Sequence, residues 1–91
     1  MSVTRPARLA GTWYEADPDR LTTQIERWTS PPQALGEPPR LLLVPHAGHM
    51  WSGPVAGAGF SVLRDQTVRR IVLLAPSHYV PFTGVALPTR P

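Results

Sequence analysis

The chain has 91 residues, enough for one small domain or for part of a larger one. Its nine positive charges are all arginine and outweigh six acids, for a net charge of +3. These arginines are dispersed, which argues against the basic stripe that nucleic-acid binding requires. The chain has no cysteine, and hence no disulfide or thiolate metal ligand. Its apolar runs are too short for a signal peptide or a membrane span, so we expect a soluble cytoplasmic protein without a membrane or nucleic-acid partner.

The first predicted helix follows an irregular arm at residues 1–16. Asp17 followed by Pro18 is a typical helix start, because the acid can cap the first turn and proline is tolerated at the first helical position. Apolar residues then recur at spacings of four and three, as on one face of a helix. The pattern predicts a helix over about residues 18–29, with a stripe of Leu21, Ile25 and Trp28.

Two continuous apolar runs, residues 41–44 and 71–75, lie on either side of a second predicted helix. A run without alternation suits a strand that is covered on both faces, as in a parallel sheet. The second helix is expected to open at Pro54, after a loop at 45–53, and to end near residues 64–65. Its small residues would let it pack closely on the sheet, with a face of Val55, Ala58, Gly59 and Val62.

Strand, helix and strand in this order predict an α/β fold, a βαβ unit of a parallel sheet flanked by helices. Residues 84–87 are expected to add a third, shorter strand. Two parallel strands with one connecting helix leave apolar surface uncovered, so we interpret the chain as a fragment or truncated product of a larger protein. No internal boundary is expected, and residues 1–91 are taken as the N-terminal portion of one domain.

Two histidines follow the two predicted strands at similar distances. His46 lies two residues after the first run and His78 three residues after the second. The carboxyl ends of parallel strands share one edge of a sheet, so the two imidazoles are expected to converge there and to bind one metal ion. His49, three residues after His46, is a candidate third ligand or acid–base catalytic group.

Residues beside these histidines suggest an anion or substrate pocket. Ser52 and Gly53 precede the predicted helix start, where backbone N–H groups can bind an anion, and Trp51 lies in the same loop as His46. The simpler interpretation makes Ser52 a helix cap and the tryptophans packing residues. Ser77 precedes His78, but no nucleophile elbow or acid partner accompanies it, which argues against a serine hydrolase.

Several motifs together resemble the MEMO family, which in bacteria is also labelled AmmeMemoRadiSam system protein B. They occur in the family's order and at its separations, over nearly the whole chain. The most specific pair is Pro-His-Ala-Gly at 45–48 and Pro-Ser-His at 76–78; the others are Arg5-Pro6-Ala7, Ala10-Gly11, Trp13-Tyr14 and Ser52-Gly53.

The resemblance implies a fold like that of class III extradiol dioxygenases and matches His46 and His78 to two metal ligands. It implies iron or copper as the metal, with a further ligand outside this chain. His49 stands where the family usually has a tyrosine. An AMMECR1-like protein or a radical-SAM protein is the implied partner.

Three functional hypotheses stay open from the sequence. The first is a metal-dependent, redox or dioxygenase-like protein with a partial metal site. The second is a non-catalytic module that binds a peptide or an anion in the same crevice. The third is a non-functional truncated fragment, since a parallel sheet needs partners that 91 residues do not supply.

Overall fold

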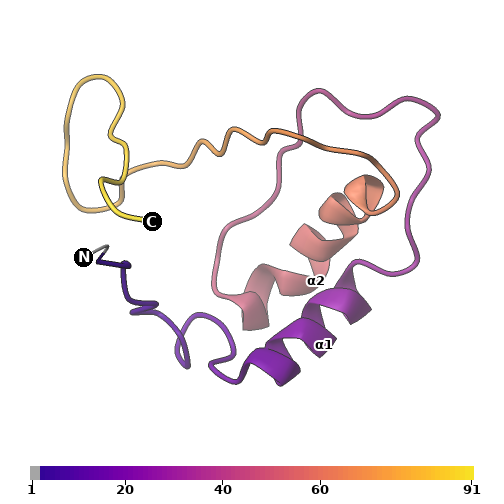
Figure 1. Ribbon diagram of the computed structural model, residues 1–91, viewed down its shortest axis with the longest axis horizontal. Helices are drawn as coiled ribbons and strands as arrows, with labels where there is room; N and C mark the ends of the chain where they lie inside the picture. Colours follow the sequence, from indigo (N-terminus) through magenta and orange to yellow (C-terminus); the bar gives the residue numbers. More distant parts are fainter. Residues whose placement is uncertain (1–2) are drawn as a thin grey trace.

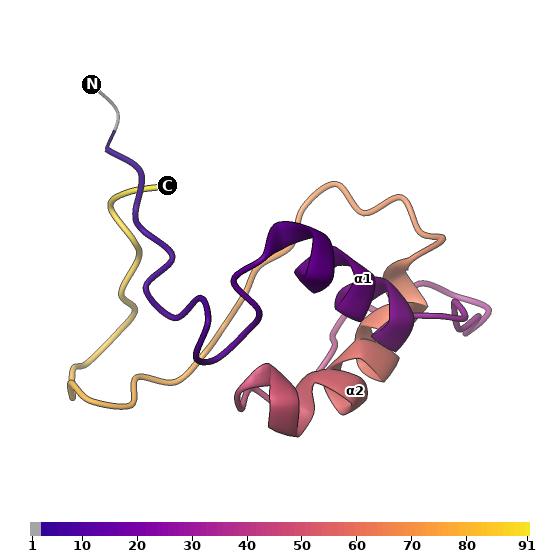
Figure 2. The same ribbon diagram turned by 90° about the horizontal axis from the view of Figure 1, so that it is seen from below.

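The computed structural model describes residues 3–91, and its regular secondary structure there is entirely helical (Figure 1). Helix α1 spans Pro18–Trp28, helix α2 spans His49–Phe60, and a short 3-10 helix, η1, follows at Ser61–Leu63. The two α-helices pack against each other. Long connections without regular hydrogen bonding make up most of the rest of the described chain, as Figure 2 shows from below.

Helix α1 starts and ends nearly where its local sequence predicts. The Asp17 side chain accepts a hydrogen bond of 2.9 Å from the Arg20 backbone N–H, and Pro18 occupies the first helical position. Such a cap stabilises a helix by about 1 kcal/mol. The backbone N–H of Thr29 donates to the Ile25 carbonyl and closes the last turn. The prediction of this helix is confirmed.

Helix α2 begins at His49, five residues before the predicted start at Pro54, so that boundary was wrong. The His49 backbone N–H donates to the Trp13 carbonyl at 2.7 Å, which satisfies one of the donors left free at a helix start. The Ser52 hydroxyl donates to the Ala47 carbonyl at 2.9 Å. The N-terminal arm therefore sets the start of α2, through a contact that no local pattern shows.

The contact between α1 and α2 depends on glycine. A Cβ atom placed on Gly53 would lie 2.6 Å from ring carbons of Trp28, and one on Gly57 would meet the Trp28 backbone. Both glycines are buried, whereas Val55 and Ala58 are exposed. The small residues of α2 thus allow close approach to α1, and the predicted face of Val55 and Ala58 against a sheet was wrong.

The predicted α/β fold, with its βαβ unit of a parallel sheet, is contradicted by the structure of residues 3–91. Within them no strand forms at 41–44, 71–75 or 84–87, and the one backbone bridge is local, between Ala10 and Tyr14. No backbone hydrogen bond joins the two apolar runs across this described part. A continuous apolar run favours burial, but a strand must also pair in register with another segment. These runs form no such pairing within residues 3–91.

The described chain has no closed apolar core. None of its hydrophobic side chains from residue 3 onward is fully buried, and Leu43 is 91% exposed. The radius of gyration is 15.1 Å, against about 12 Å for a closely packed domain of this length. No helix in the range that the structure covers is long and apolar enough to cross a lipid bilayer. His46 and His78 therefore lie on open connecting segments, outside the small two-helix unit.

Candidate functional site

The structure brings His46 and His78 together. Their ring centroids lie 5.3 Å apart, with an angle of 43° between the ring planes. His46 precedes α2 by a short loop, and His78 lies in the connection that follows η1. Both side chains are exposed. Two residues far apart in the chain thus meet at the surface, although the sheet that was expected to align them does not form.

Short turns hold the backbone at each histidine. Gly48 is the N-cap of α2, and its carbonyl accepts hydrogen bonds from the backbone N–H groups of Trp51 and Ser52. On the other segment, the Ser77 hydroxyl donates to the Val80 carbonyl at 2.6 Å and closes a turn around His78. The Ser77 hydroxyl therefore takes part in a turn, and within residues 3–91 it forms no hydrogen bond to a basic side chain.

The histidine pair stands without a third ligand in the described part of the chain. Residues 3–91 contain no group of three or more histidine, cysteine, aspartate or glutamate side chains that could hold a metal ion. A catalytic metal centre usually has three protein ligands and an open position. What this chain offers is two imidazoles, which suit zinc, copper, iron or nickel better than calcium or magnesium.

His49 occupies the junction between the arm and the two helices. Its ring lies 5.8 Å from that of Tyr14 and meets Trp28 edge-on at 5.7 Å. Its Nδ1 atom is buried and has no hydrogen-bond partner among residues 3–91. These contacts make His49 part of the packing that joins the arm to α1 and α2, and its catalytic role stays a prediction.

The three predicted pocket residues, Trp51, Ser52 and Gly53, lie in different environments. Ser52 and Gly53 are buried inside α2, whereas Trp51 is 78% exposed. Trp51 and Trp13 line a hollow of about 280 Å³, together with Thr12, Ala47, Gly48 and Met50. Trp13 was expected to be a packing residue, and only its position in the folded arm shows that it lines this hollow. Anion binding at Ser52 and Gly53 stays a prediction.

Comparisons with known proteins agree on one family. The sequence profile described as "Memo-like protein" matches residues 5–90. Protein MEMO1 of Homo sapiens is 39% identical over 85 residues, which cover 93% of this chain and 29% of that protein. A MEMO1 family protein of Schizosaccharomyces pombe is 38% identical over 87 residues, 94% of this chain and 27% of that protein. No solved structure matches. The chain spans less than a third of the length of these relatives.

Proposed function

Because this chain belongs to the family of Memo-like proteins, we propose that it contributes His46 and His78 as two ligands of a metal centre. The observation that supports this function is the approach of the two imidazole rings to 5.3 Å. The metal would be iron or copper, bound by the ring nitrogens and by at least one further ligand from elsewhere. When bound, it would supply redox or Lewis-acid chemistry.

The spacing of the two rings fits a shared ion. An imidazole nitrogen binds such a metal at about 2.0–2.1 Å, which puts the ring centroid about 3.2 Å from the ion. Two such rings at an angle of about 110° would have centroids about 5.2 Å apart. The separation between His46 and His78 is 5.3 Å. Since both side chains are exposed, further ligands can reach an ion between them.

Metal content of histidine variants tests the proposal. The protein would be loaded with Cu(II) or Fe(II), dialysed, and analysed by mass spectrometry of the metal. We expect bound metal in the wild type and in His49→Ala, and its loss in the double variant His46→Ala/His78→Ala. His49→Ala is the matched control because it removes an imidazole only three residues from His46 in the chain. Equal metal in the double variant and the wild type would end the proposal.

A second candidate function, peptide binding, has its own supporting observation. Trp13 and Trp51 line the hollow of about 280 Å³; Trp51 is 78% exposed and Trp13 is 48% exposed. Aromatic side chains of this kind commonly anchor a partner's apolar residue. A peptide with a central Leu or Phe would bind the wild type and lose affinity with Trp51→Ala, and binding would persist without His46 and His78. Equal binding by Trp51→Ala would refute this function.

A further inference from the structure

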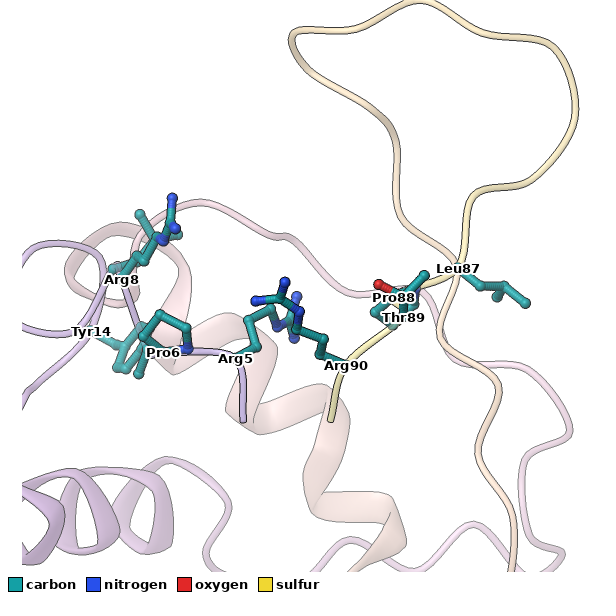
Figure 3. A pocket seen from close by; sticks show the side chains of 10 residues that line it. Arg5, Pro6, Arg8, Tyr14, Leu87, Pro88, Thr89 and Arg90 are labelled. Atoms are coloured by element: carbon teal, nitrogen blue, oxygen red, sulfur yellow. The ribbon is translucent and has the colours of Figure 1, made fainter. Parts of the chain in front are cut away.

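A second and larger cavity lies where the two ends of the described chain come together. Its volume is about 820 Å³, and it is lined by residues 5–9, by Tyr14 and by residues 87–90. In Figure 3, the side chains of Arg5 and Arg90 extend toward each other from the two chain segments, and Arg8 extends separately from that pair. None of these residues belongs to the histidine pair.

Backbone hydrogen bonds hold the walls of this cavity in place. The Arg5 N–H donates to the Pro91 oxygen at 2.8 Å, which ties the arm to the last segment. Within the arm, the Arg8 N–H donates to the Pro6 carbonyl at 3.0 Å, and the Gly11 N–H donates to the Tyr14 carbonyl at 2.7 Å. Gly11 has a φ of 86°, a conformation that favours glycine. The cavity is therefore shaped by turns within the arm and by the hydrogen bond that joins the arm to the last segment.

The charged side chains that line this cavity are all positive. Three of the nine arginines, Arg5, Arg8 and Arg90, line it, and no aspartate or glutamate is among its lining residues. Arg90 is distant from Arg5 and Arg8 in the sequence and comes close to Arg5 only in the folded chain. The positive guanidinium groups around one space repel each other. An anion bound between them would be attracted by each and would offset that repulsion.

We propose that this cavity binds a small molecule through its phosphate groups. A guanidinium presents N–H donors in a planar fork that matches two oxygens of a phosphate, and arginine is favoured over lysine for this contact. Arg5 and Arg90 would each donate hydrogen bonds to the phosphate, one from each of the two chain segments. Tyr14 also lines the cavity. The site is separate from the metal centre proposed above, and its existence does not depend on that function.

Calorimetric titration with inorganic pyrophosphate tests the proposal. We expect saturable binding to the wild type and a loss of about tenfold in affinity for each arginine replaced, so about a hundredfold for Arg5→Gln/Arg90→Gln. The matched control is Arg20→Gln/Arg40→Gln, which changes the net charge equally at exposed positions outside the cavity. That control should bind pyrophosphate within about twofold of the wild type.

Two results would overturn the site. One is the absence of pyrophosphate binding by the wild type. The other is an equal loss of affinity in both double variants, because binding would then reflect net charge alone. Arg5→Lys/Arg90→Lys guards against an effect of misfolding, since it keeps the charge and the backbone contact but lacks the planar fork. We expect it to bind about tenfold more weakly than the wild type, with an unchanged circular dichroism spectrum; affinity equal to the wild type would refute the bidentate contact.

Discussion

Replacing Gly57 by alanine should weaken the contact between α1 and α2 and destabilise the protein. Elsewhere in a helix this substitution is usually stabilising. Alanine favours the helix over glycine by about 1 kcal/mol. At Gly57, however, a Cβ atom would lie 2.8 Å from the carbonyl oxygen of Trp28 and 2.9 Å from its carbonyl carbon. Backbone atoms cannot rotate away, so the helices must separate, and such overpacking costs about 1–3 kcal/mol. The expected net loss of stability is about 1 kcal/mol.

Gly59→Ala is the matched control for this prediction. A Cβ atom there would meet a side-chain methyl group, Cγ1 of Val44, at 2.7 Å. Val44 lies in a connection without regular structure and can give way, so the gain in helix propensity should prevail. Urea unfolding followed by far-UV circular dichroism would place the two midpoints about 1–2 M apart, with Gly57→Ala the lower, for a slope of about 1 kcal/mol per M. A Gly57→Ala midpoint at or above that of Gly59→Ala would refute the packing argument.

Substitutions at three further positions test other features of the structure by the same urea titration. Asp17→Ala should cost about 1 kcal/mol by removing the cap on the Arg20 N–H, and Asp17→Asn should keep most of that stability. Thr29→Val should cost about 1 kcal/mol, because the Thr29 hydroxyl accepts a 2.8 Å hydrogen bond from Arg64 Nη1; an unchanged midpoint would make that bond irrelevant to stability. Gly36→Ala should cost about 1–2 kcal/mol because Gly36 has a φ of 79°, and an unchanged midpoint would show that this loop has no fixed conformation.

The two helices show which parts of this structure could be predicted from sequence. All the signals for α1 lie within residues 17–28: a capping acid, a proline at the first position and a regular apolar spacing. The start of α2 depends instead on the Trp13 carbonyl, which belongs to a segment far away in the chain. Sequence patterns describe neighbours along the chain, so a boundary set by a distant acceptor could not be found from them.

The sheet prediction was wrong because it rested on hydrophobicity alone. Residues 41–44 and 71–75 have the continuous apolar character of buried strands, yet side chains in both runs stay exposed, with Leu74 at 85%. Pairing of parallel strands depends on contacts between distant segments and on cover over both faces. Neither condition can be read from the runs themselves. The small residues of α2 were expected to pack closely on a sheet, but the surface that Gly53 and Gly57 approach is Trp28.

The approach of His46 to His78 was predicted from a sheet edge that residues 3–91 do not form, so the pair is held differently from the way the prediction assumed. Its two segments are joined by turns and connections without a strand ladder, and both rings are exposed. Such a site is poorly preorganised, and an ion that binds it must order the segments as it binds. Amide hydrogen exchange at residues 45–48 and 77–80 should therefore slow when Cu(II) is added to the wild type and stay unchanged in His46→Ala. Metal binding without added protection in these two segments would mean that the ion lies somewhere other than between the two histidines.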